Sequence, residues 1–171
     1  MTTTNTNTIQ LKRKSSGKTG MWLMLIGCLA VPLAVGFVSS WLTMDQMELF
    51  GQMNKPALAP PAWLFPIAWT ILYILMGVAS FLILRSNSKY KVGAICLYIS
   101  MLVMNFMWSP VFFNSQDYWV ALGIIAVMWT TTVLLAIVSW FVDRRATYLL
   151  IPLILWTTFA TYLNAGIAVL N

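Results

Sequence analysis

The sequence predicts an all-α integral membrane protein, a bundle of five transmembrane helices. Of its 171 residues, 60% are hydrophobic and 8% are charged, whereas soluble domains carry about 25% charged residues. A soluble core of this size has no room for so many apolar side chains, but a bilayer solvates them. The chain also contains five apolar runs, each long enough for the roughly 20 helical residues that cross a membrane.

The five runs fill most of the chain. The expected spans are 21–43, 63–84, 92–113, 119–142 and 147–170. Backbone groups in hydrocarbon need partners within their own segment, and the alternation of a strand is absent, so each run is expected to be a helix. Residues 1–20 are polar and basic and lack the cleavage site of a signal peptide, so we expect a disordered tail there. Residues 21–171 then form one membrane domain.

Lys and Arg gather at one end of the predicted helices. Nine of the ten lie in the tail and in the second and fourth connectors, and Lys55 in the first connector is the tenth. This asymmetry predicts a cytoplasmic N-terminus and an outward C-terminus in a bacterial cell membrane, with the mitochondrial outer membrane as the alternative. The basic clusters are too short and scattered to predict a nucleic-acid-binding groove.

No ionisable side chain falls inside a predicted span, and the chain has no His. Proton-coupled antiport, ion pumping and acid-base catalysis within the bilayer normally need such groups. We therefore expect neither a metal site nor a required cofactor. Aromatic rings and a few amides remain as candidate functional groups.

The nine Trp residues divide by depth. Those at helix ends suit the aromatic belt at the membrane surface: Trp22, Trp41, Trp63, Trp119 and Trp140. Those deeper in the spans are Trp69, Trp108, Trp129 and Trp156. A deep indole N–H seeks a hydrogen-bond partner, so these four either join helices together or face a ligand.

Polar and aromatic side chains share one layer in the outer half of the bundle. Trp69, Asn105 and Asn164 all fall about 9–12 Å from the outer helix ends, at 1.5 Å per residue. Ser109 shares the helix face of Asn105. An i, i+4, i+8 stripe on the last helix contains Trp156, Ala160 and Asn164. These side chains either join helices by hydrogen bonds or wall an aromatic cavity that opens toward the long first connector, 44–62.

Three segments resemble those of a known family. They are KPALAPPAWLFPIAWTILYILMGVAS, LVMNFMWSPVFF and LLIPLILWTTFATYLNAGIAVLN. In order and spacing, residues 21–171 resemble the TspO/MBR family of tryptophan-rich sensory proteins and translocator proteins, formerly called peripheral benzodiazepine receptors. The resemblance implies a five-helix membrane protein, often a homodimer, that binds porphyrins such as protoporphyrin IX and haem.

The motif positions, together with the layer described above, indicate the candidate ligand-binding residues. They are Phe50, Pro60, Trp69, Tyr73, Asn105, Trp108, Ser109, Phe112, Trp156, Ala160, Leu163 and Asn164. Trp69 and Trp156 correspond to tryptophans implicated in porphyrin breakdown in bacterial relatives. The resemblance thus implies a pocket among the helices, beneath the first connector.

The chain departs from the family pattern at several positions. Leu58 stands where KPxWxPP has Trp, Leu153 replaces the Tyr of a PY pair, and Leu49 and Phe50 stand where an aromatic pair is usual. The first connector therefore offers fewer aromatic contacts than in many relatives. No Lys or Arg follows Tyr162, so the cholesterol-binding pattern of animal members is absent.

Three functions remain open at this stage. In the first, a receptor, transport or sensing protein stacks a porphyrin between Trp69, Trp108 and Trp156. Asn105 and Ser109 would meet its polar atoms and Lys55 a propionate; without His, free-base porphyrin is a better ligand than haem. In the second, an enzyme degrades porphyrin in light and oxygen through Trp69 and Trp156. In the third, a membrane scaffold binds lipid or a partner helix.

Overall fold

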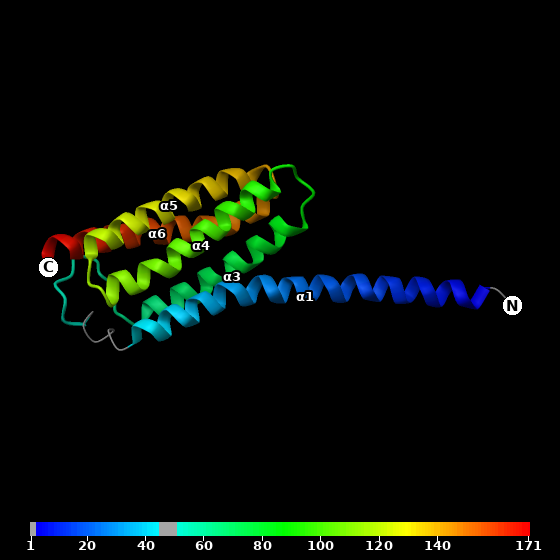
Figure 1. Cartoon of the computed structure of the whole chain (residues 1–171), viewed down its shortest axis with the longest axis horizontal. Coiled ribbons are helices and arrows are strands. Elements are labelled where there is room, and N and C mark those ends of the chain that lie inside the picture. Colours follow the sequence, from blue (N-terminus) through cyan, green and yellow to red (C-terminus); the bar gives the residue numbers. More distant parts are fainter. Residues whose placement is uncertain (1–2, 45–50) are drawn as a thin grey trace.

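The computed structural model describes residues 3–44 and 51–171, with side chains from residue 18 onward in those ranges, and long helices dominate it (Figure 1). The helices are α1 (Thr3–Thr43), α3 (Leu64–Arg85), α4 (Lys91–Phe113), α5 (Tyr118–Trp140) and α6 (Arg144–Leu170). Each contains a segment long and apolar enough to cross a membrane. The predicted all-α, five-helix membrane bundle is confirmed, with most helix ends within three residues of the predicted positions.

Helix α1 is much longer than its predicted span. Its apolar part is Lys18–Thr43, but the helix begins at Thr3, where a disordered tail was expected. At 1.5 Å per residue it is roughly 60 Å long, about twice the thickness of the hydrocarbon layer, and its N-terminal half projects beyond the bundle (Figure 1). Extending an existing helix costs far less than starting one, and residues 3–16 contain no Pro or Gly to stop it.

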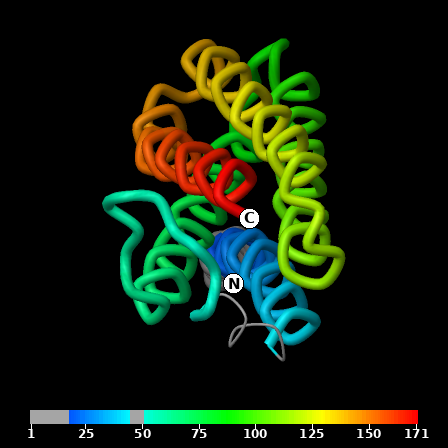
Figure 2. The backbone as a smooth tube through the Cα atoms, turned by 90° about the vertical axis from the view of Figure 1, so that its left-hand side faces the viewer, coloured from blue at the N-terminus to red at the C-terminus, as the bar shows by residue number. Residues whose placement is uncertain are grey.

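The five helices form a closed ring in the order α1, α3, α6, α5, α4, as the end-on view shows (Figure 2). Two glycines bring α1 and α3 together. A Cβ atom at Gly77 would lie 2.9 Å from the carbonyl oxygen of Cys28, and one at Gly36 would lie 2.1 Å from the ring of Tyr73. The seam between α1 and α3 is therefore tight at these two levels.

Two clusters of buried apolar side chains make up the core. The larger contains the fully buried Met76, Met101 and Met128 and runs through most of the bundle. The smaller, built around Phe112 and Ile167, lies at the end that carries the first loop and the C-terminus, called here the loop end. Because Phe112 and Ile167 are each only 2% exposed, this cluster closes the ring at the loop end.

The described part of the first loop, 51–63, is attached to the C-terminus of α6. Asn54 N donates to Asn171 Oδ1 at 3.1 Å, and Asn171 Nδ2 donates back to Asn54 O at 2.9 Å. Asn54 Nδ2 also donates to Leu170 O at 3.4 Å. The loop therefore runs beside α6 after leaving α1, as Figures 1 and 2 show.

Further contacts extend this attachment along α6. Tyr162 Oη donates to Ala57 O at 2.6 Å. A Cβ atom at Gly166 would lie 2.6 Å from the Pro56 ring, so the close approach of loop and helix requires glycine there. Leu58, which stands where a family Trp was expected, has φ 71° and is 82% exposed. Its side chain points away from the bundle.

Candidate ligand-binding site

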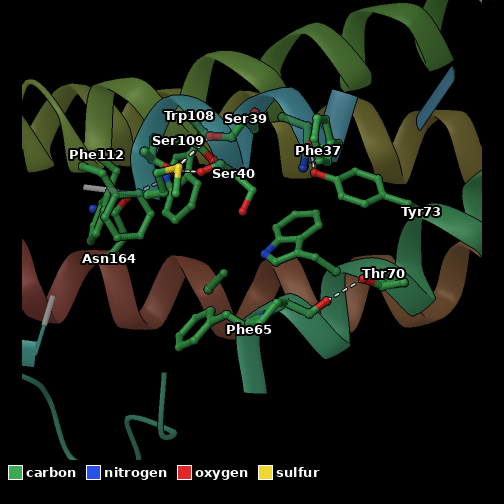
Figure 3. A pocket seen from close by; sticks show the side chains of 18 of the residues that line it. Phe37, Ser39, Ser40, Phe65, Thr70, Tyr73, Trp108, Ser109, Phe112 and Asn164 are labelled. Carbon is green, nitrogen blue, oxygen red and sulfur yellow. Dashed lines mark hydrogen bonds between the residues drawn. The ribbon is translucent and has the colours of Figure 1, made fainter. Parts of the chain in front are cut away.

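A cavity of about 580 Å³ lies inside the ring of helices near the loop end (Figure 3). Residues of α1, α3, α4 and α6 line it, together with Met44 directly after α1, and no residue of α5 or of the loop segment 51–63 does. The predicted site residues that line it are Trp69, Tyr73, Asn105, Trp108, Ser109, Phe112, Ala160, Leu163 and Asn164. Trp69, Asn105 and Asn164, which were predicted to lie at one depth, therefore line the same cavity.

Two predicted site residues lie outside this cavity, and Phe50 falls outside the described residues. Pro60 belongs to the loop segment attached to α6, and none of residues 51–63 lines the cavity, so the expected opening beneath the first loop stays a prediction. Trp156 packs edge-on against Phe65 on α3, with 5.9 Å between ring centroids. At 3.6 residues per turn, Trp156 is about 80° around α6 from Asn164, which explains why the two do not share a wall.

Stacked aromatic pairs form two walls of the cavity. On α3, Trp69 and Tyr73 stack with ring centroids 5.5 Å apart, and on α4, Trp108 and Phe112 stack at 4.9 Å. Both pairs are spaced i, i+4, which places their side chains one above the other on a helix. Figure 3 shows Trp108 and Phe112 toward one end of the cavity and Tyr73 toward the other.

The two asparagines hold these aromatic walls in place. Asn105 Oδ1 accepts a hydrogen bond from Tyr73 Oη at 2.7 Å, and Asn164 Oδ1 accepts one from Trp108 Nε1 at 3.0 Å. Asn164 Nδ2 also donates to Tyr118 O at 2.8 Å. The asparagines therefore join helices and shape the cavity at once, and the contact of Asn105 with ligand atoms stays a prediction.

Other polar groups remain available to a ligand. Ser39 is 4% exposed, and its Oγ has no hydrogen-bond partner within the described residues. The same part of the chain supplies no hydrogen bond to Trp69 Nε1 or Ser109 Oγ, both of which belong to the cavity wall. Among the described residues no charged side chain lines the cavity, and Lys55 lies on the first loop. This lining suits a largely apolar ligand with a few polar atoms.

The wall contributed by α1 was missed by the sequence reasoning. It includes Gly36, Phe37, Ser39, Ser40 and Thr43. Thr43 Oγ1 donates to Ser39 O at 2.9 Å, so its hydroxyl is satisfied within its own helix. The signal was present as GFVSSWLT, a cluster of small and hydroxyl side chains near the end of an otherwise apolar helix.

A second hollow, of about 430 Å³, lies between α1 and α4 on the bundle surface. Its lining is wholly apolar: Ala34, Val35, Val38, Ile99, Leu102, Val103 and Phe106. Without a polar group to orient a ligand, it is a weaker candidate site than the larger cavity.

Comparison with known proteins identifies relatives along nearly the whole chain. The model of the TspO/MBR family matches residues 28–170. The tryptophan-rich protein TspO of Chlorobaculum tepidum is 37% identical over 153 residues, which are 87% of this chain and 96% of that protein. The tryptophan-rich sensory protein of Cereibacter sphaeroides is 33% identical, covering 84% and 88% of the two chains. The translocator protein of Sus scrofa is 29% identical, covering 84% and 87%.

Proposed function

The chain belongs to the TspO/MBR family, and on this basis we propose that this multi-pass membrane protein binds a porphyrin in the cavity and acts as its receptor, sensor or carrier. The cavity is the observation that carries the proposal. Its 580 Å³ lie within the range of about 300–1,000 Å³ typical of sites for small molecules. Relatives named for sensing and translocation support a role in signalling or movement of the ligand.

A porphyrin matches the chemistry of the walls. Its flat conjugated ring stacks on aromatic side chains, and the stacked pairs of Trp69 and Trp108 present such faces on α3 and α4. Ser39 Oγ and Ser109 Oγ are polar groups that can meet the ring nitrogens. Because no described cationic side chain lines the cavity, we place the ligand's carboxylates outside it. Since the chain has no His, histidine ligation of haem iron is excluded and free-base porphyrin is the better ligand.

A fluorescence titration of the purified protein with protoporphyrin tests the proposal. We expect saturable quenching with a Kd of about micromolar order, and a loss of about tenfold in affinity for Trp69→Leu, because one stacking face is removed. Trp129→Leu is the matched control, since Trp129 is on α5, away from the cavity, and its Nε1 bonds Thr158. A wild-type protein without saturable binding, or equal losses in both variants, would contradict the proposal.

Light-dependent degradation is a second proposed activity, and the position of Trp69 favours it. Trp69 lines the cavity, whereas Trp156 is separated from it by Phe65. We therefore expect illumination of the porphyrin complex in air to oxidise Trp69 well before Trp156, as mass spectrometry of peptides would measure. Preferential oxidation of Trp156 would contradict this assignment, and porphyrin loss that Trp69→Phe leaves unchanged would exclude catalysis by Trp69.

The membrane orientation is also proposed. Basic residues cluster at the end of the bundle opposite the loop end, so we place that end in the cytoplasm and the loop end outside a cell membrane. A reporter enzyme active only outside the cytoplasm, fused after Asn171, is expected to be active. If a reporter that works only in the cytoplasm is active at this position instead, the proposed orientation is wrong.

A further inference from the structure

We propose that the cavity opens sideways into the bilayer through a slot between α1 and α3, and that ligands enter it from the hydrocarbon layer. The inference rests on the proposed binding of a membrane-dissolved porphyrin. The rims of the slot are Leu33, Phe37 and Ser40 on α1 and Met44 directly after it, with Pro66 and Thr70 on α3. Residues 51–63 of the first loop then need no movement for the ligand to pass.

Exposure identifies this opening. Among the described residues, every exposed residue that lines the cavity lies on α1, directly after it or on α3, and together they are the six rim residues. Phe37 is 74% exposed and Met44 is 58% exposed although both line the cavity. The rim residues from Leu33 to Met44 follow a spacing of i, i+4, i+7, i+11, which is one face of a helix, and Pro66 and Thr70 are one turn apart.

The other sides of the cavity are closed by buried residues. At the loop end, Phe112 and Ile167 are buried, and Met53 from the first loop packs against their cluster. On the α4 and α6 sides, Asn105 and Asn164 are 3% and 1% exposed and are bonded to neighbouring helices. The far end of the slot closes beyond Leu33, where Gly77 of α3 packs against Cys28 and Leu29 of α1.

Residues 51–63 of the first loop do not line this slot. They are attached to α6 through Asn54 and Ala57, and none of them lines the cavity. The loop end of α1 is instead held to α4, where Asn114 Nδ2 donates to Leu42 O at 3.0 Å. Thr70, on the opposite rim, bonds within its own helix to Pro66 O at 2.7 Å. The rims are thus supported separately, and a ligand can part them without breaking these bonds.

The chemistry of the rims suits a flat apolar molecule dissolved in lipid. Four of the six rim residues are apolar, and the hydroxyls of Ser40 and Thr70 are the polar side chains among them. Trp41 and Trp63, 65% and 64% exposed, lie near the ends of α1 and α3 and suit the membrane surface. A porphyrin can therefore pass its ring between the helices while its carboxylates stay at the headgroup level.

Binding kinetics in lipid nanodiscs test the route with protoporphyrin as the probe. The double variant Ser40→Phe, Thr70→Phe fills the slot, and we expect both its association and dissociation rates to fall about tenfold, since a lost contact alone would speed dissociation. Val127→Phe with Thr130→Phe, on the exposed face of α5, is the matched control. Unchanged rates in the slot variant would overturn the proposal.

A second variant fixes the loop to α6. Asn54→Cys with Asn171→Cys, in a background where Cys28 and Cys96 are Ala, is oxidised to a disulfide and compared with its reduced form. We expect both rates to stay within about twofold, because entry does not pass the loop. If closing the disulfide blocks entry, the route runs past the loop and the proposal is wrong. If the wild-type protein binds no porphyrin, the proposed function is wrong, and this outcome is distinct from a failure of the entry route.

Spin labels test the slot without any ligand. Labels at Ser40→Cys and Thr70→Cys, in the same Cys28→Ala, Cys96→Ala background, are expected to collide readily with oxygen and poorly with a water-soluble nickel complex. This pattern means that the slot faces hydrocarbon. Strong collision with the nickel complex, or weak collision with both reagents, would show a water-filled or closed slot and overturn the proposal.

Discussion

Gly36→Ala is the sharpest test of how α1 shapes the cavity. The added Cβ would lie 2.1 Å from Tyr73 Cε2 and 2.9 Å from its Cζ, whereas carbon atoms in contact are about 3.5–4.0 Å apart. The ring or the helix must therefore move by more than about 1 Å. The Tyr73 ring is 8% exposed, stacks on Trp69 and donates to Asn105, so it has little free space.

The cost follows from these contacts. Overpacking a buried site costs about 1–3 kcal/mol, and a hydrogen bond inside a membrane protein contributes about 0.6 kcal/mol. The better helix propensity of Ala offsets about 0.5–1 kcal/mol. We therefore expect the free energy of unfolding to fall by about 1–3 kcal/mol. Displacement of the Tyr73 ring should also weaken porphyrin binding by about tenfold, because it disturbs one aromatic wall.

Unfolding in mixed detergent micelles measures the first effect and the porphyrin titration the second. The matched control is Gly27→Ala on the same helix, where an added Cβ meets nothing within 4 Å. It should leave the free energy of unfolding unchanged or raise it by up to about 1 kcal/mol. If Gly36→Ala is as stable as Gly27→Ala and binds porphyrin normally, the tight seam and its link to the cavity are wrong.

Three further changes probe other parts of the structure. Tyr162→Phe should speed amide hydrogen exchange in the first loop, which loses a bond to α6, while Tyr148→Phe should not; equal exchange would contradict the attachment. Asn164→Leu should lower the free energy of unfolding by about 1–3 kcal/mol, because an indole and a backbone carbonyl lose their partner; an unchanged detergent-unfolding midpoint would refute this. The hydrogen bond from Arg145 lowers the pKa of Asp143, so its stabilisation is present at neutral pH and lost below about pH 4. Asp143→Asn should therefore flatten the acid side of a melting-temperature profile against pH, and an identical profile would contradict this.

The depth of a side chain in the membrane was predictable because helical rise is constant. Counting residues placed Trp69, Asn105 and Asn164 in one layer, and the structure brings all three to one cavity. The direction of a side chain around the helix was less predictable, because each step of four residues departs from 3.6 residues per turn and the angular difference grows along the stripe. Trp156, eight residues from Asn164, turned toward Phe65 instead of the cavity. The depth of a side chain follows from its own helix alone, whereas the direction in which it points depends on the neighbouring helices.

The first loop and the α1 wall also depended on neighbours. The prolines of the loop suggested a pocket entrance; in the structure Pro56 packs closely against Gly166 of α6, and residues 51–63 do not line the cavity. Gly36 likewise sets α1 against Tyr73, which brings Ser39 and Ser40 to the cavity. Neither glycine stands out in a helix read alone.

The amino-acid sequence by itself determined the membrane class, the five helices and the layer of polar and aromatic groups. These follow from composition, from the length that hydrocarbon requires and from the rise of a helix, all of which are local properties. Only the tertiary structure decided the order of helices in the ring, the attachment of the loop to α6 and the exposed slot between α1 and α3. Those features arise from close contacts between segments distant in sequence, where the presence or absence of one Cβ atom decides which surfaces meet.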